Sequence, residues 1–439
     1  GQVEKVDRII KQDKLLVELP KDTKMMVCMA VGAVYESDNI YRTLSLYSHQ
    51  SEEVLAKTVF VLNVNWLDQD EQDPQKLAQI KKTIEEVERI KKDFPQLKIA
   101  VFQERYVKEI LVAERGMNIH GQFIKDVHDV ALRSLQLSGI DHEVYLLSND
   151  ADCQGMSDSY LSKLLEQAEK ESEKDAFLGR IEWDTKRWPD YPGFHLSTRF
   201  MQFLDLVSRH PGNKRIKHIP TSGANSMVKA STLAAIGGID PGNELGVGAD
   251  INVGRRIKYA RGVDTEPIGY NHVAWLETNG DRAFNYYAYG ESIVAMWSDF
   301  ARKGYKGRKE RGVSDLGSRH YYEGVKFSKS KFRPNIPKLK LDQQGNFVPE
   351  DLERDWHDIV VRFEYQINSG LWAYFQDDFE LWQRALNFTF GNIRPPRWEI
   401  QDGQVKITKV GQSWLKQQLK SFAAKNSQEI LYQRGGHRA

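Results

Sequence analysis

The sequence has few cysteines and no long apolar run. Only Cys28 and Cys153 occur among 439 residues, which is too few for a disulfide framework or a thiolate zinc site. No stretch approaches the roughly 18 apolar residues that a membrane span needs, and residues 1–14 lack the apolar core of a signal peptide. We therefore expect a soluble, cytoplasmic protein with no transmembrane segment.

The sequence also lacks an excess of charge of either sign. Its 62 Lys and Arg residues nearly balance 61 Asp and Glu residues, and the formal net charge is +1. Such a chain has no global field to attract nucleic acid, so we expect no nucleic-acid partner. Hydrophobic residues make up 40% of the chain, enough for a sizeable core, and 439 residues exceed what one compact core usually takes. The sequence does not indicate an oligomeric state.

The charges are nevertheless unevenly distributed along the chain. Residues 301–340 carry 13 Lys and Arg against three acidic residues, with the Gly, Ser and Pro content typical of a loop, lid or linker. This basic segment could close over a diphosphate, contact a phosphorylated acceptor, touch a membrane peripherally, or simply be solvated. We predict four regions: an N-terminal extension (1–23), an α/β domain (24–280), a helix with the basic linker (281–345) and a helical, aromatic-rich region (346–439).

Within residues 24–280, apolar runs bounded by turn residues alternate with longer amphipathic stretches. This alternation is typical of βαβ units, and it predicts a Rossmann-like α/β fold with a mostly parallel sheet flanked by helices. The C-terminal region has Trp356, Phe363, Trp372 and Trp382 at loosely helical spacing. It predicts helices with an aromatic packing face, and a sugar-stacking platform is the alternative.

Two carboxylates follow the predicted strand at 143–147. Asp150 and Asp152 stand one residue apart directly after it. The carboxyl ends of parallel strands form the edge where open α/β sheets bind ligands. Oxygen ligands there suit Mg²⁺ or Mn²⁺, which bind one or two carboxylates together with phosphate oxygens. An Asp-x-Asp pair in a solvated turn is the alternative.

Four segments stand in the order found in the family 2 glycosyltransferases of GT-A fold. The first strand and helix, the Asp-x-Asp strand end and a block further along resemble the corresponding parts of that family. The block is the most specific part: a Gly-Asn turn, a short helix, a Gly-Gly-hydrophobic-Asp turn, and an Asp that opens a helix carrying Arg. The resemblance covers about residues 24–280, and its segments are 27–36, 39–50, 144–152 and 222–256.

The resemblance implies transfer of a sugar, such as a hexose, from a nucleotide-sugar donor to a carbohydrate or other hydroxyl acceptor, with Mn²⁺ or Mg²⁺ as cofactor. Asp152 and His272 would bind the metal, which neutralises charge on the leaving diphosphate. Asp250 would be the catalytic base of inverting transfer. The donor- and nucleotide-binding residues would be Ala30, Glu36, Asn65, Asp150 and Asp152, and the acceptor-side residues Trp183, Asp184, Gly223 and Asn225.

Several of these residues have a structural alternative. His272 could be a hydrogen-bonded histidine at a strand end, and Asp250 a carboxylate stabilised by the dipole of its helix. Trp183 beside Asp184 suits the apolar face and hydroxyls of a sugar, but a packing tryptophan fits as well. Residues 30–35 and 63–65 depart from the family pattern, so the identity of the nucleotide base stays open.

Two other functions fit parts of the sequence. A sugar-phosphate nucleotidyltransferase also uses an α/β sheet with paired acids, although its Gly-rich phosphate loop is missing near the first strand. A non-catalytic, glycosyltransferase-like binding module would explain the departures at residues 30–35 and 63–65. The signature Gln-x-x-Arg-Trp of processive family members is absent, which favours single-sugar transfer. The donor, the acceptor and the choice between inversion and retention are not encoded in a recognisable form.

Overall fold

The structure is a computed structural model, and the chain forms two compact units. The described residues of the first unit lie within 2–182 and 224–279, and those of the second lie largely within 183–208 and 352–420. Gly223 and the basic segment 301–340 lie outside the described residues. The structure describes residues 2–115, 119–185, 191–208, 224–241, 249–262, 265–280, 284, 287, 352–375, 379–391 and 394–420.

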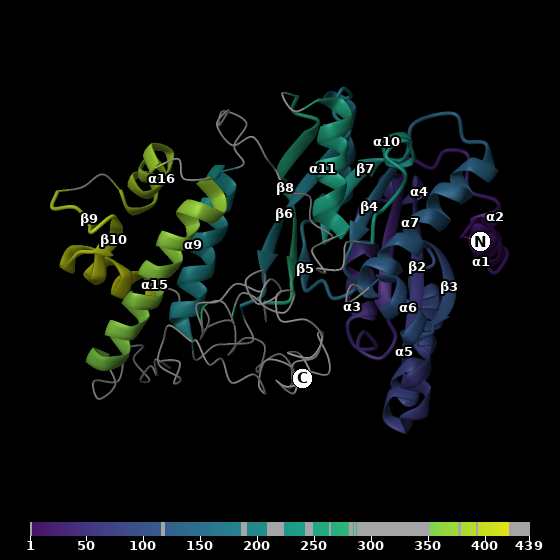
Figure 1. Cartoon of the computed structure of the whole chain (residues 1–439), viewed down its shortest axis with the longest axis horizontal. Helices are drawn as coiled ribbons and strands as arrows, with labels where there is room; N and C mark the ends of the chain where they lie inside the picture. The colour runs from purple at the N-terminus through teal and green to yellow at the C-terminus, as the bar shows by residue number, and fades with distance from the viewer. Residues whose placement is uncertain are drawn as a thin grey trace. The chain divides into compact units, whose positions relative to one another are not determined.

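The first unit is built on an eight-stranded sheet with the order β3-β2-β1-β4-β7-β6-β8-β5 (Figure 1). Strands β3, β2, β1 and β4 are parallel neighbours, β7 is antiparallel to both β4 and β6, and β5 is antiparallel to β8. The predicted α/β fold with a mostly parallel sheet is therefore confirmed. The strands are β1 Met25–Gly32, β2 Thr58–Leu67, β3 Lys98–Tyr106, β4 Tyr145–Asn149, β5 Gly155–Met156, β6 Ala176–Trp183, β7 Asn225–Lys229 and β8 Ile268–Thr278.

Helices cover both faces of this sheet because successive strand residues point to opposite sides. Along β1, Met25, Val27 and Met29 enter one core, whereas Met26 and Cys28 enter the other. The first core is closed by α3 Ile40–Ser48, α4 Glu52–Ala56, α5 Pro74–Asp93 and α8 Tyr160–Lys170. The second is closed by α1 Gln2–Ile10, α2 Lys14–Val17, α7 Ile119–Ser138, α10 Ala230–Ala235 and α11 Ala249–Arg261.

Helix α5 shows how the sequence fixes an element. Asp73 accepts hydrogen bonds from the backbone N–H groups of Gln75 and Lys76, and Pro74 occupies the first turn, where its missing N–H costs nothing. Ile80, Val87 and Ile90 recur at helical spacing and are buried against the sheet. A 3-10 turn, η1 Asp68–Gln72, precedes it, and α6 Lys108–Arg115 packs beside α7.

The N-terminal residues 1–23, which we expected to be an extension, are part of the first unit. Val6, Ile9 and Ile10 of α1 and Leu16 of α2 are buried in the second core. Helix α1 packs against α7, and α2 packs against both α7 and β3. Residues 183–208, which we expected inside the α/β domain, are grouped with the second unit.

The second unit contains α9 Pro192–Ser208, α15 Leu352–Phe375 and α16 Phe379–Phe390, with α9 and α15 packed side by side (Figure 1). Its core includes Trp356, Phe363 and Trp382, so the predicted aromatic packing face is confirmed for these side chains. The C-terminal region is not purely helical. It also forms an antiparallel hairpin of β9 Trp398–Gln401 and β10 Gln404–Ile407, followed by a helical segment at 409–420.

None of the helices that the structure describes is both long and apolar enough to cross a membrane. The longest, α15 and the two 20-residue helices α5 and α7, carry charged residues on their surfaces.

Candidate functional site

The order of the parallel strands creates a switch point between β1 and β4. The chain passes from β1 to β2 on one side of β1, whereas β4 is added on the other side. Ligands of open α/β sheets bind outside the carboxyl ends of the strands at such a point. Glu36 follows the end of β1, and Asp150 and Asp152 follow the end of β4. Three of the predicted donor-site carboxylates therefore come from the two strands that flank the switch point.

The turn after β1 holds Glu36 in place. The backbone N–H groups of Tyr35 and Glu36 both donate to the carbonyl of Gly32, at 2.9 and 3.0 Å. The Asn39 Nδ2 donates to Glu36 Oε2 at 2.9 Å, the single side-chain hydrogen bond to this carboxylate from the described residues. Glu36 is half-buried. Its carboxylate thus keeps acceptor capacity for a ligand or a proton.

Hydrogen bonds from nearby side chains hold the turn after β4 in place. The Thr43 hydroxyl of α3 donates to the carbonyl of Ala151 at 2.7 Å, and the Cys153 thiol donates to Asn149 Oδ1 at 3.0 Å. The Gln154 side chain donates to the carbonyl of Asp152 at 2.7 Å. Asp150 and Asp152 are both half-buried. The turn therefore presents two carboxylates on a backbone that α3 and β4 hold.

The three carboxylates share one electrostatic environment. Burial, the charge of Asp152 and, to a smaller extent, the charge of Asp150 raise the pKa of Glu36 from 4.5 to about 7, and the hydrogen bond from Asn39 opposes them in part. Burial, followed by the charges of Asp152, Asp150 and Glu36, raises the pKa of the Cys153 thiol far above its ordinary value. Carboxylates that repel one another in this way are stabilised when a cation or a proton joins them.

These carboxylates do not form a cage that could hold a metal alone. Among the residues that the structure describes, no three or more His, Cys, Asp or Glu side chains are placed to bind one ion. Mg²⁺ and Mn²⁺ do not need such a cage, because they usually take one or two carboxylates and complete their shell with water and substrate phosphates. Asp152 and its neighbours fit a cation that arrives with a phosphorylated ligand.

The predicted metal ligand His272 lies on β8, and its role as a ligand stays a prediction. His272 is exposed in the middle of β8, next to Asn271, whose side chain donates to the carbonyl of Lys163 in α8. Glu277 of β8 pairs with Gly155 of β5 in an antiparallel register, and Asp152 precedes Gly155. Along β8, Glu277 stands five positions after His272, a separation of about 17 Å of strand.

The remaining donor-side residues have different surroundings. Ala30, on β1, lines a small pocket together with Asp150. Asn65 is 2% exposed, and its Nδ2 donates to the carbonyl of Asn63 at 2.9 Å. The structure thus keeps Ala30 at the site, whereas the Asn65 side chain is buried and bound to the backbone of its own strand.

The predicted acceptor-side residues that the structure describes have separate surroundings. Asn225 is fully buried, accepts from the Tyr160 hydroxyl at 2.6 Å and donates to the carbonyl of Arg180 at 3.1 Å. Its amide is thus used to join β7, β6 and α8. Half-buried Trp183 and buried Asp184 are grouped with the second unit, and Asp250 occupies the first turn of α11.

Gly179 of β6 leaves the room that Asn225 needs, so Gly179→Ala is expected to be strongly destabilising. A Cβ at Gly179 would collide with the Asn225 amide and approach the carbonyl oxygen of Ala274 to 2.7 Å. Overpacking of this kind costs about 3 kcal/mol of unfolding free energy. Urea denaturation measures it, with Gly155→Ala as the control, because a Cβ there meets its nearest neighbour at an ordinary 3.4 Å. Equal losses in the two variants would contradict the role given to Gly179.

A buried Ser–His pair was not predicted. The Ser148 Oγ of β4 lies 2.8 Å from His128 Nε2 of α7, and His128 Nδ1 lies 2.8 Å from the carbonyl oxygen of Ile124. Burial lowers the pKa of His128, so the ring is neutral at pH 7. The sequence does hold a signal: His128 stands at helical spacing among the apolar residues Ile124, Val127 and Ala131.

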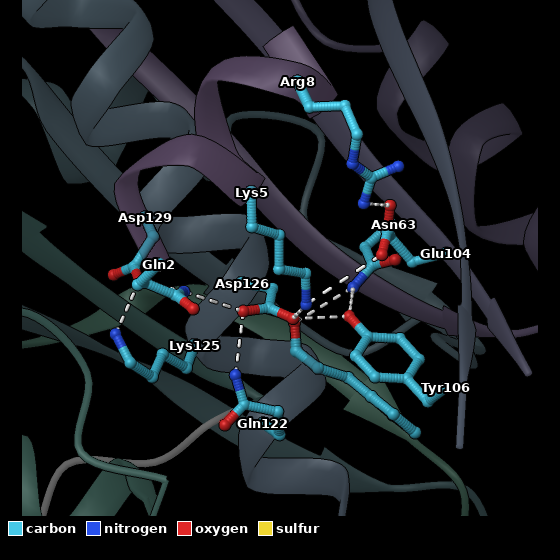
Figure 2. Close-up of polar contacts among 11 residues, drawn as sticks. Gln2, Lys5, Arg8, Asn63, Glu104, Tyr106, Gln122, Lys125, Asp126 and Asp129 are labelled. Atoms are coloured by element: carbon cyan, nitrogen blue, oxygen red, sulfur yellow. Dashed lines mark hydrogen bonds and ion pairs between the residues drawn. The ribbon is translucent and has the colours of Figure 1, made fainter. Parts of the chain in front are cut away.

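A second buried polar cluster surrounds Asp126 (Figure 2). Asp126 is 1% exposed, and a carboxylate offers about four acceptor positions. Four donors fill them: Lys5 Nζ at 2.6 Å, the Tyr106 hydroxyl at 2.6 Å, Gln122 Nε2 at 2.8 Å and Gln2 Nε2 at 3.1 Å. Asp126 therefore has no acceptor position left for a ligand, and its contacts attach α1 to α7 and β3.

Glu36 is expected to make stability depend on pH in metal-free buffer. Its carboxyl ionises near pH 4.5 in the unfolded chain and near 7 in the folded one, so the folded state binds more protons between these values. The free energy of unfolding therefore falls as the pH rises from 4.5 to 7, by up to about 3 kcal/mol. Urea denaturation with EDTA at several pH values should show this slope in the wild type and not in Glu36→Gln.

The exposed Glu85 of α5 provides the control for this experiment. Glu85→Gln should keep the wild-type slope because its carboxylate lies in water. A Glu36→Gln variant with the same pH profile as the wild type would show that Glu36 does not hold a proton in the folded protein.

Comparison of the chain with protein-family models found no match, and comparison with curated proteins found none either.

Proposed function

We propose that the protein is a metal-dependent glycosyltransferase of GT-A type that moves a sugar, such as a hexose, from a nucleoside-diphosphate sugar to an acceptor hydroxyl. The observation that carries the proposal is the meeting of Glu36, Asp150 and Asp152 at the carboxyl ends of β1 and β4. An open α/β sheet binds a nucleotide at this switch point, and a diphosphate brings the phosphate oxygens that Mn²⁺ or Mg²⁺ needs beside a carboxylate.

Each of the three carboxylates would act on a different part of the donor. Asp152 would hold the cation, which when bound supplies Lewis-acid stabilisation of the leaving diphosphate. Asp150 would accept hydrogen bonds from hydroxyls of the ribose or the sugar. Glu36, held by Asn39, would lie at the nucleotide side, where it adds negative charge that favours the cation. Positioned groups of this kind lower the barrier because they need no rearrangement during the reaction.

The acceptor half of the proposal rests on the resemblance of residues 222–256. Asp250, in the first turn of α11, would take the proton of the acceptor hydroxyl as it attacks, with inversion at the anomeric carbon. Trp183, Asp184 and Gly223 would be the acceptor-side residues. Asn225 would have a supporting role, since its amide is bound to Tyr160 and Arg180.

The proposal is tested by incubating the protein with a panel of nucleotide sugars and Mn²⁺. Release of a nucleoside diphosphate from one donor, abolished by EDTA and restored by Mn²⁺ or Mg²⁺, supports glycosyl transfer. Formation of a nucleoside triphosphate on addition of pyrophosphate would instead identify a nucleotidyltransferase. Tight binding of a nucleotide sugar without turnover would identify a binding module. We propose the cytoplasm as its location, because Cys28 and Cys153 are both buried and free.

A further inference from the structure

Ser148 is a polar residue at the centre of the sheet. It pairs with Cys28 of β1 on one side and with Ser226 of β7 on the other, so its side chain points to the face covered by α7. A buried hydroxyl costs free energy unless it is hydrogen-bonded, and His128 of α7 is its partner at 2.8 Å. The pair links α7 to β4, the strand that ends directly before Asp150.

The contact that the other ring nitrogen of His128 makes decides which residue of the Ser148–His128 pair is the donor. A carbonyl oxygen accepts and never donates, so His128 Nδ1, 2.8 Å from the carbonyl of Ile124, carries the hydrogen. In a neutral imidazole the other nitrogen, Nε2, is then an acceptor, and Ser148 must donate to it. The hydroxyl of Ser148 therefore donates its hydrogen bond to His128. Toward any other group, the Ser148 oxygen can only accept a hydrogen bond.

Ser148 lines a small pocket together with Asp150 of the carboxylate cluster. The pocket measures about 10 Å³, which is room for one water-sized group. Its lining mixes apolar and polar residues, among them exposed His120 and half-buried Asp150. The lining residues are Cys28, Ala30, His120, Ile124, Val127, His128, Ser148, Asn149 and Asp150.

We propose that this pocket is a hydroxyl subsite, in which one hydroxyl of the nucleotide-sugar donor gives its proton to the Ser148 oxygen that His128 has oriented. The inference rests on the proposed function and adds a residue pair to it. Ser148 and Asp150 are two positions apart along the chain and line the same pocket. They offer two acceptors side by side, as two neighbouring hydroxyls of a ribose or a sugar require.

The same chemistry excludes other groups from the pocket. A phosphate or carboxylate oxygen would meet the lone pairs of Ser148 and the negative charge of Asp150, which repel it. A methyl group would fill the space but leave the buried Ser148 oxygen without the hydrogen bond it can accept. A water-sized donor, which is what a hydroxyl is, satisfies both the size and the polarity of the pocket.

The test compares Ser148→Ala with Ser226→Ala. Ser226 is the buried cross-strand neighbour of Ser148, but it does not line this pocket. Isothermal titration calorimetry in Mn²⁺ buffer measures the affinity of each protein for UDP, GDP, ADP and CDP and for UDP-glucose and GDP-mannose. Loss of one hydrogen bond should weaken binding about three- to tenfold in Ser148→Ala and leave Ser226→Ala at the wild-type value. Thermal unfolding of the three proteins controls for folding.

Deoxy ligands identify which hydroxyl is bound. If it belongs to the ribose, the 2′-deoxy or 3′-deoxy form of the nucleotide should bind the wild type more weakly, by the same factor, and lose nothing further in Ser148→Ala. If it belongs to the transferred sugar, Ser148→Ala should weaken binding of the nucleotide sugar and not of the nucleoside diphosphate. Both results support the subsite. The measurements of deoxy ligands with the wild type do not need the variant, so they still test the subsite if Ser148→Ala does not fold.

Two outcomes would overturn the inference, and they are distinguishable. If the wild type binds a nucleotide and Ser148→Ala binds it equally tightly, the subsite is refuted and the proposed function stands. If the wild type binds none of these nucleotides or nucleotide sugars in Mn²⁺ buffer, both proposals fail together.

Discussion

Replacing Asp152 by Asn should reduce the metal-dependent cleavage of a nucleotide sugar at least a hundredfold. The amide keeps the shape of the carboxylate but removes the charge that would hold the cation, and loss of such electrostatic stabilisation costs about 10²–10³ in rate. The charge of Asp152 is also the second-largest cause of the raised pKa of Glu36, after burial. The variant should therefore lower the pKa of Glu36 as well. Initial rates of nucleoside diphosphate release at several Mn²⁺ concentrations measure the first effect.

Asp158 offers the matched control for Asp152. It is an exposed carboxylate six residues further along, in the turn that leads to α8. Asp158→Asn removes the same charge from the same segment of chain, so it should keep the wild-type rate and the wild-type dependence on Mn²⁺. If Asp152→Asn retained both, the cation would have to be held elsewhere, and the proposed role of Asp152 would be wrong.

The sheet could be predicted from the sequence because its parallel strands are continuous apolar runs separated by long amphipathic helices. The sequence has apolar runs at 25–34, 57–64 and 97–103, and these start and end within three residues of the observed bounds of β1, β2 and β3. The ends shift because strand length depends on pairing with the next strand. β2, for instance, continues to Leu67 because β3 pairs with it as far as Tyr106.

Two elements were missed for different physical reasons. Helix α1 is polar over most of its surface. Lys5 of this helix contacts Asp126 and Tyr106, which lie more than 100 residues further along the chain. Its place in the core therefore depends on tertiary contacts that the local sequence does not indicate. The hairpin of β9 and β10 did have a local signal. Asp402 and Gly403 form its two-residue turn with φ values of 51° and 73°, and Asp-Gly is a preferred pair for such turns.

The candidate site was predictable only where its residues follow strand ends. Asp150 and Asp152 are recognisable because they come directly after the apolar run of β4. His272 could not be placed, because its distance from Asp152 depends on the antiparallel register of β5 and β8, which the sequence does not fix. Ser148 and His128 are twenty residues apart, and their contact depends on how α7 lies across the sheet.

Replacing Asp250 by Asn should abolish transfer while leaving donor binding intact. Asp250 stands in the first turn of α11. A general base that takes the proton of the attacking hydroxyl contributes about 10²–10⁴ to the rate, and an amide cannot take a proton. Because Asp250 would touch the acceptor and not the nucleotide, the affinity for nucleoside diphosphate and Mn²⁺ should match that of the wild type.

Hydrolysis of the nucleotide sugar measures this loss without knowledge of the acceptor, since water takes the place of the acceptor hydroxyl and needs the same base. Glu266→Gln is the control, because Glu266 is an exposed carboxylate between α11 and β8. Proton NMR of the released sugar reports the anomer formed first, which should be opposite to that of the donor. Wild-type hydrolysis in Asp250→Asn would exclude it as the base. Loss of rate together with loss of nucleotide affinity would instead mean that Asp250 supports the donor side, so the two measurements together separate catalysis from binding.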